Sequence, residues 1–426
     1  MPVLARRLVA IAVALLTLSG LAILGLRATN SAIAQGPLVT ERPGSALASP
    51  GSASQPASTP SASLDSSAIF SAIERQVESL RGLPAASVGK PELISTSALA
   101  DRLKARFDTE YPRKRRADDN VVLRGLGLLR ADQDAASLQL KLLTGQVIGY
   151  YDDQSKRMVV VSDAGLTPAA KITYAHEYTH ALQDASFGLS RLGIDTAGQD
   201  DRDLARLSLV EGDATATMFL WAFDHLTTEE LIGVGATPIP DLADVPQWMV
   251  KELELPYVAG ASFVTGLRAE GGSDAIDAVF RDPPASTEQV LHPEKYDARE
   301  APIAVRAPPV ATQTGWSTPV PNTEGEAIIS IWLQALGVSA SVADRAAAGW
   351  GGDRLAAADG PSGAFLLGWH LTWDTSADAD QFAAAYATAR TRLAFSSRLV
   401  RLSSRDVLVV HASSQALLDR EIAAAR

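Results

Sequence analysis

His176 and His180, with Glu177 directly after the first histidine, form a His-Glu-x-x-His motif. On a helix, residues four positions apart lie one turn apart on the same face, so both imidazoles can reach one metal ion. Zn²⁺ is a suitable ion, because it binds imidazole nitrogens in a tetrahedral shell and lowers the pKa of water. The neighbouring Glu177 carboxylate can then act as the general base. The alternative is an ordinary amphipathic helix that carries two surface histidines.

A catalytic zinc site needs a third protein ligand and keeps one position for water. Glu211 is our candidate, because it lies in an apolar, helix-forming run where an unpartnered carboxylate would be costly to bury. A structural ion pair is the alternative role for Glu211. Asp184 and Asp213 are candidates for orienting a ligand histidine through its other ring nitrogen, although a solvated helix carboxylate is the favoured interpretation of each.

The segments before the motif predict elements that could position it. Residues 146–151 and 158–162 are short β-rich runs that predict a hairpin. Thr167 and Pro168 then predict a capped helix start with proline in the first turn. The edge of the hairpin could accept an extended peptide as an added strand, or the hairpin could simply cover the core.

Beyond the motif, the chain resembles the gluzincin zinc metallopeptidases, in which a glutamate on a later helix completes the His-Glu-x-x-His site. More specifically, it is similar to a largely uncharacterised family of bacterial extracytoplasmic proteins assigned as metallopeptidases. The resemblance covers about residues 66–300 and rests on segments 176–184, 209–214 and 286–296. It implies that His176, His180 and Glu211 bind one Zn²⁺ and that Glu177 is the base.

Hydrolysis through a tetrahedral intermediate also needs a group that stabilises the oxyanion. His292 is our first candidate, because a protonated imidazole donates a charged hydrogen bond. Tyr257 and Tyr296 are further candidates. A His-Pro pair such as that at His292 can also serve only to end a helix. The remaining histidines are expected to be packing or surface residues; they are His225, His370 and His411.

The first residues indicate the compartment. Arg6 and Arg7 precede residues 8–26, which carry no charge and are long enough to cross a bilayer core of about 30 Å. Residues 1–30 are therefore a transmembrane signal-anchor or a cleaved signal peptide, and the rest of the chain is extracytoplasmic. Residues 31–65 predict a disordered linker rich in Ser, Ala, Pro and Gly. A signal-anchor would hold the protein at the membrane; cleavage would release it.

Composition narrows the function classes. The chain has no cysteine, which excludes disulfides and thiolate ligands. Its formal net charge of −11 argues against a nucleic-acid partner. The one basic cluster, residues 113–116, is followed by acidic residues and is interpreted as a solvated helix end. Oligomeric state is left open.

The predicted fold class is α+β and mostly helical. Residues 66–300 are expected to form a zincin-like catalytic domain with the hairpin upstream of the metal helix, 301–322 a Pro-rich connector, and 323–426 a small α+β domain. Residues 349–354 are interpreted as a turn that permits φ > 0, with a tryptophan available for the wall of a groove. Helices are expected at 66–82, 96–111, 117–130, 134–144, 377–391 and 412–425, and C-terminal strands at 364–373, 393–402 and 406–411.

These features lead to the hypothesis of a zinc peptidase, tethered or secreted, that acts on a peptide or protein substrate. One alternative is an envelope protein-binding module whose metal site is structural or vestigial. Another is a metal-dependent hydrolase of non-peptide amides, such as cell-wall crosslinks. The sequence shows no clamp for a chain terminus, so it does not separate endopeptidase from exopeptidase activity.

Overall fold

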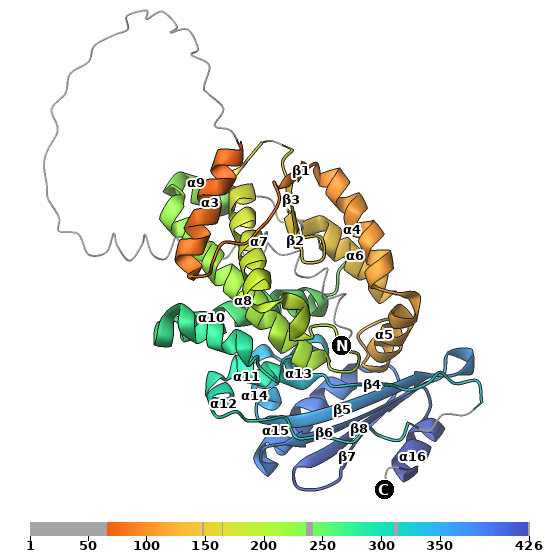
Figure 1. The fold of residues 1–426 in the computed structure, drawn as a ribbon. Helices are drawn as coiled ribbons and strands as arrows, with labels where there is room; N and C mark the ends of the chain where they lie inside the picture. Colours follow the sequence, from red (N-terminus) through yellow and green to blue (C-terminus); the bar gives the residue numbers. More distant parts are fainter. Residues whose placement is uncertain (1–65, 147–148, 164, 236–241, 311–313, 425–426) are drawn as a thin grey trace, which may run out of the picture.

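The computed structural model describes residues 66–146, 149–163, 165–235, 242–310 and 314–424 (Figure 1). The predicted membrane segment, residues 1–30, and the predicted linker, residues 31–65, lie outside the described residues. Across the ranges that are described, no helix combines the length and apolar character needed to span a bilayer.

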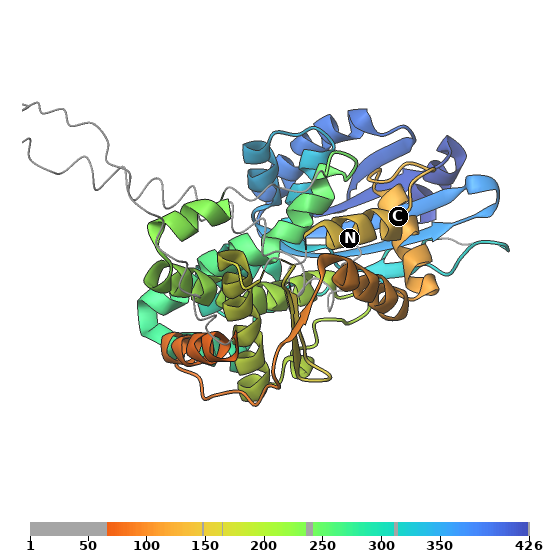
Figure 2. The same cartoon turned by 90° about the horizontal axis from the view of Figure 1, so that it is seen from above.

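The protein is mostly helical with two separate sheets, which confirms the predicted α+β class. The helical half precedes the larger sheet in the chain, and the two views place them at opposite ends of the molecule (Figures 1 and 2). The helices of the first part are α3 (Ser66–Arg81), α4 (Thr96–Glu110), α5 (Arg113–Gly125), α6 (Ala135–Gln146), α7 (Pro168–Phe187), α8 (Asp200–His225), α9 (Thr228–Gly235), α10 (Gln247–Arg281), α11 (Thr287–Leu291) and α12 (Pro293–Asp297), with the 3₁₀ turn η1 (Leu189–Leu192).

The small sheet contains the predicted hairpin. Strands β2 (Gly149–Asp152) and β3 (Arg157–Val161) are antiparallel, and β1 (Glu92–Ile94) adds to β3 in parallel. The strand order β1-β3-β2 makes β2 an edge strand of this sheet. The hairpin packs on α7, which places its edge next to the helix that carries the metal motif.

The start and end of α7 follow from its sequence. Thr167 caps the helix by accepting a hydrogen bond from the Ala170 amide, and Pro168 occupies the first turn. Gly188 ends the helix in the left-handed region at φ 71°. The helix is buried over most of its length between α3, α8 and the hairpin, so its polar residues must find partners inside the protein.

Helices α8 and α10 cross at two glycines. A Cβ added at Gly260 would lie 2.0 Å from the Ser208 carbonyl oxygen, and one at Gly212 would lie 2.2 Å from the Gly260 carbonyl carbon. Only residues without a side chain allow the two backbones to approach this closely. Gly212 directly follows Glu211, so this crossing fixes the part of α8 that carries the candidate third ligand.

The C-terminal sheet has five antiparallel strands in the order β4-β5-β6-β8-β7. Its first strand, Val320–Asn322, lies inside the segment that the sequence assigned to a connector. The strands and helices of this part are β4 (Val320–Asn322), α13 (Gly325–Ala335), α14 (Ala340–Ala347), β5 (Trp350–Asp359), η2 (Pro361–Gly363), β6 (Phe365–Trp373), α15 (Ser376–Ala389), η3 (Arg390–Arg392), β7 (Ser396–Arg401), β8 (Asp406–Ala412) and α16 (Gln415–Ala424).

The interpretation of residues 349–354 as a turn is wrong, because 350–354 belong to a strand. Gly349 does adopt φ 75°, but Trp350 begins strand β5 and is fully buried. Its indole N–H donates to the Asp353 carboxylate at 3.0 Å, and the indole of Trp369 donates to the same carboxylate at 2.9 Å. The tryptophan is therefore a core residue, and the carboxylate that it shares with Trp369 joins β5 to β6.

The larger sheet shares its core with the helical half. One sheet face packs with α13 and α15 against helices α4 to α6, and α16 covers the other face. The Trp332 indole donates to the Leu126 carbonyl at 3.0 Å across this boundary. Residues 323–426 therefore pack directly against the preceding part of the chain and share a hydrophobic core with it.

Substituting Gly260 tests the helix crossing. We expect Gly260→Ala to destabilise the protein by about 1–3 kcal/mol or more, because the added methyl group forces α8 and α10 apart. Gly266→Ala is the matched control on the same helix, since no atom of the described residues lies within 4 Å of its added Cβ. Alanine there should be neutral or stabilising by up to about 1 kcal/mol. Urea unfolding measures both; equal stability of the two variants would contradict the crossing.

His411 on β8 should make stability depend on pH. Its Nδ1–H donates to the Gly125 carbonyl of α5 at 2.8 Å, and its Nε2 accepts from the Tyr386 hydroxyl at 3.0 Å. Burial lowers the pKa of His411 to about 4, against about 6.5 when unfolded. Stability from this group is complete above pH 6.5 and is lost as the pH falls towards 4, by about 3 kcal/mol. Urea unfolding from pH 7 to 4.5 should show a smaller loss for His411→Gln than for wild type; parallel curves would refute the assignment.

Candidate metal centre

The two motif histidines and Glu211 converge on one point. His176 and His180 come from α7 and Glu211 from the facing helix α8. The two Nε2 atoms are 3.1 Å apart, and Glu211 Oε2 lies 3.2 Å from Nε2 of His176 and 3.4 Å from Nε2 of His180. All three residues are buried, and together they form a group that could hold a metal ion. The sequence-predicted ligand set is thus brought together from residues 35 positions apart.

The spacing of these three atoms fits a tetrahedral ion. Ligands 2.0–2.1 Å from a tetrahedral centre are separated by about 3.3 Å from one another. The observed separations of 3.1, 3.2 and 3.4 Å lie on both sides of that value. The other oxygen of Glu211, Oε1, is buried without a hydrogen-bond partner among the described residues. A cation among these atoms would compensate the cost of burying them, so the donor set fits zinc in both chemistry and size.

Gln183 determines which nitrogen of His180 carries its proton. The Gln183 amide nitrogen donates to the Val210 carbonyl and to Asp213 Oδ2, both at 3.0 Å. This leaves its oxygen, Oε1, facing His180 Nδ1 at 2.9 Å. Because that oxygen only accepts, Nδ1 must donate, and the lone pair of the neutral ring is on Nε2. The ring is therefore held in the tautomer that a metal ligand requires.

Glu177 lies beside the ligand group without belonging to it. Its Oε2 accepts a hydrogen bond from the Tyr151 amide of the edge strand β2 at 2.8 Å. Burial, followed by the negative charge of Glu211, raises the pKa of Glu177 to about 8, although His180 opposes the shift. A carboxyl group with such a pKa can take up and release a proton near neutral pH, as a general base must.

The pKa values of the three candidate ligands are shifted in different directions by burial and by one another. Burial alone would lower the pKa of His180, but the Glu211 carboxylate reverses this and raises it to about 9. Burial alone would raise the pKa of Glu211, but His180 and His176 lower it to about 2. Burial lowers the pKa of His176, so this ring is neutral. One positive charge on the imidazoles therefore balances one carboxylate, and a bound cation would replace that proton.

The two candidates for orienting a histidine have different positions. Asp213 accepts from Gln183 and so reaches His180 through that amide rather than directly. Asp184 contacts the hairpin instead of a ligand ring; it accepts from the Tyr151 hydroxyl at 2.8 Å and pairs with Lys156. Its role is to hold the hairpin against α7.

Of the oxyanion candidates, the structure brings only Tyr257 to the ligands. Its ring stacks on His176 with centroids 6.1 Å apart. His292 instead pairs with Glu326 of α13 at 2.8 Å, and Tyr296 donates to the Asp282 carbonyl at 2.8 Å.

The expected catalytic role of His292 is therefore not retained. The helix before it, α11, contacts the first turn of α8, where Asp201 accepts from the Thr287 amide at 3.0 Å. Glu211 lies ten residues further along α8, which is about 15 Å along the helix axis. His292 therefore lies near the start of α8 rather than near Glu211, and its pairing with Glu326 raises its pKa.

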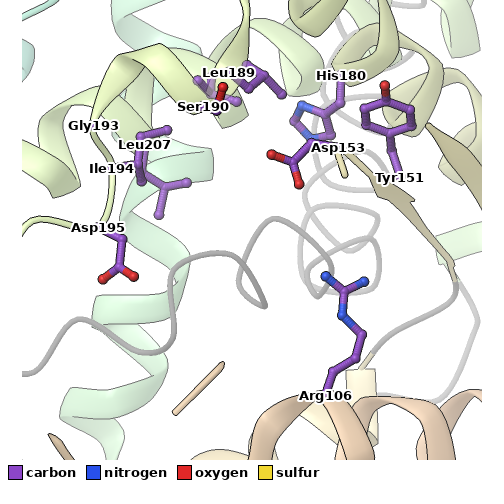
Figure 3. A pocket seen from close by; sticks show the side chains of 11 residues that line it. Arg106, Tyr151, Asp153, His180, Leu189, Ser190, Gly193, Ile194, Asp195 and Leu207 are labelled. Atoms are coloured by element: carbon purple, nitrogen blue, oxygen red, sulfur yellow. The ribbon is translucent and has the colours of Figure 1, made fainter. Parts of the chain in front are cut away.

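A cavity of about 210 Å³ opens beside His180 (Figure 3). Arg106 extends towards it from α4, and Asp153, from the turn between β2 and β3, also lines it. The apolar part of its wall comes from Leu189, Ile194, Leu207 and Val210. Sequence reasoning missed Arg106, Asp153 and Gln183. The only available signal was for Gln183, three residues after His180 and hence on the same helical face.

Comparison with known proteins concerns the other end of the chain. A family model described as a domain of unknown function (DUF8575) matches residues 313–421, which contain the five-stranded sheet and its helices. No curated protein matches the chain. No solved structure matches it either.

Proposed function

We propose that this protein is a zinc-dependent peptidase that acts outside the cytoplasm. The observation that carries the proposal is the buried group of His176, His180 and Glu211, at tetrahedral separations, with Glu177 beside it. Zinc held there would act as a Lewis acid that polarises a carbonyl and lowers the pKa of water. The extracytoplasmic location rests on the sequence of residues 1–30 alone.

The role of Glu177 is to move a proton. Its carboxylate accepts a proton from the attacking water and passes it to the leaving amine. The hydrogen bond from the Tyr151 amide fixes one oxygen, Oε2, so the carboxylate stays oriented while its protonation changes. Because burial holds its pKa at about 8, neither proton transfer is strongly uphill near neutral pH.

The edge strand supports a peptide as the substrate. The Tyr151 amide points to Glu177 and therefore away from β3, the strand that pairs with the other side of β2. In an antiparallel strand, alternate residues present both their N–H and C=O groups to the same side. An extended peptide that pairs with this edge would bring its backbone past Glu177 and the ligand group. The apolar wall of the adjoining cavity could receive one of its side chains.

We expect purified protein to bind one Zn²⁺ per chain and Glu211→Ala to bind it at least about 100-fold more weakly, because the alanine removes the carboxylate of the ligand group and leaves two ligands. Asp184→Asn is the matched control, because it lies one turn after His180 and contacts the hairpin instead of a ligand ring; it should keep wild-type affinity. Competition with a chromophoric chelator measures both. Wild-type protein that binds no zinc would remove the metal from the proposal.

Glu177→Gln should keep its zinc and lose about 10²–10⁴-fold in the rate of peptide hydrolysis. The amide preserves shape but cannot accept the proton from water, and general-base catalysis contributes about 10²–10⁴ in rate. Cleavage of a peptide library by zinc-loaded protein provides the measurement. Undiminished cleavage by the variant would exclude Glu177 as the base. A wild-type protein that holds zinc and cleaves no peptide would instead favour a structural metal site in a binding module.

A further inference from the structure

Arg81, the last residue of α3, is fully buried beside the candidate metal centre. Its Nε lies 2.8 Å from the Asp213 carboxylate of α8, and its Nη2 lies 2.8 Å from Asp277 of α10. A buried arginine is stabilised only where its charge is compensated and its N–H groups have acceptors. The fork of this guanidinium thus ties three helices together at one point.

The Asp213 carboxylate connects Arg81 to a ligand. Asp213 accepts from the Gln183 amide nitrogen at 3.0 Å, and Gln183 accepts from His180 at 2.9 Å. The donor and acceptor of each hydrogen bond are fixed, because the Asp213 carboxylate only accepts. If the carboxylate moved away from Gln183, the glutamine amide could turn and present an N–H to His180 Nδ1. The proton of the neutral ring would then lie on the ligating nitrogen.

Arg81 holds the Asp213 carboxylate in the position from which it accepts from Gln183, because the Arg81 Nε–H donates to that carboxylate at 2.8 Å. We propose that Arg81 is a positioning residue for the metal centre, which makes docking of α3 and metal binding depend on each other. The inference rests on the proposed zinc site. It assigns a role to the helix that directly follows the predicted linker: α3 completes the hydrogen-bonded support of a ligand histidine.

Other contacts hold α3 in place independently of Arg81. The Tyr174 and Tyr178 hydroxyls of α7 donate to Glu74 at 2.5 Å and to Glu78 at 2.6 Å. The Trp221 indole of α8 donates to Gln76 at 2.9 Å. These contacts do not reach the ligands, so the effect of Arg81 on the metal can be separated from its effect on helix docking.

The test uses zinc affinity of the full chain, measured by chelator competition, with three variants. Arg81→Met should bind zinc about 10- to 100-fold more weakly, as expected when the outer support of a ligand is lost. Arg81→Met combined with Asp213→Asn should regain most of the lost affinity, because the asparagine keeps an acceptor oxygen for Gln183 and leaves no buried charge there unpaired. Gln76→Leu, which removes one α3–α8 hydrogen bond, is the matched control and should bind like wild type.

Reciprocity supplies a second measurement that needs no variant. If α3 supports the metal, zinc must stabilise α3 docking by the same free energy. Hydrogen exchange at the C-terminal turn of α3 should therefore slow on addition of zinc to wild-type protein, whereas α16, on the far face of the C-terminal sheet, should not respond. This test remains available if Arg81→Met fails to fold.

The outcomes separate this inference from the proposed function. Wild-type protein that binds no zinc would overturn both. Tight zinc binding by wild type and by Arg81→Met alike would overturn the role of Arg81 and leave the peptidase proposal intact. The same holds if the double variant, correctly folded, binds no better than Arg81→Met, or if zinc leaves exchange in α3 unchanged.

Discussion

Three electron-rich atoms that converge among buried side chains are the constraint on which the helical half of the protein depends. Two imidazole nitrogens and a carboxylate oxygen repel one another unless a positive charge lies among them. This repulsion arises where the three side chains meet, and contacts from several elements hold those side chains in place. Close approach of α8 to α10 at Gly212 and Gly260 fixes the helix that carries the carboxylate. Gln183 fixes the ring of His180, and the edge strand fixes Glu177.

The acidic residues around the site differ in their pKa values and in their partners. Glu211 faces the imidazoles and is held as an anion, whereas Glu177, one residue from the first ligand, is pushed towards its neutral form by burial. Such divergence between neighbouring carboxyl groups is what distinguishes a ligand from a base. Asp213 lies behind both and is compensated by Arg81, so its charge supports the tautomer of His180 without competing for the same cation.

Local sequence signals predicted the parts of this site that depend on spacing within one element. The motif on α7, its Thr167 cap and the hairpin all follow from residues within a few positions of one another, and the structure places each of them there. Partners that meet only through the fold were not predictable: Arg81 and Asp213 are 132 positions apart. Strand β5 was missed for another reason. It contains an alanine run, and two glycines follow its first residue. These residues favour helix or turn, and only pairing with β4 and β6 makes the segment a strand.

Helix α8 links the C-terminal sheet to the ligand group. At its start, Asp201 fills the space that a side chain at position 325 would occupy, since a Cβ on Gly325 would lie 1.8 Å from the Asp201 carboxylate. Asn322 of β4 donates to Asp200 at 2.8 Å. These contacts fix the axial position of a helix whose middle carries Glu211, and a shift of one residue would rotate that carboxylate by about 100° away from the histidines. The C-terminal region that matches the family model therefore helps to position Glu211 by holding one end of α8, although it contributes no residue to the candidate ligand group.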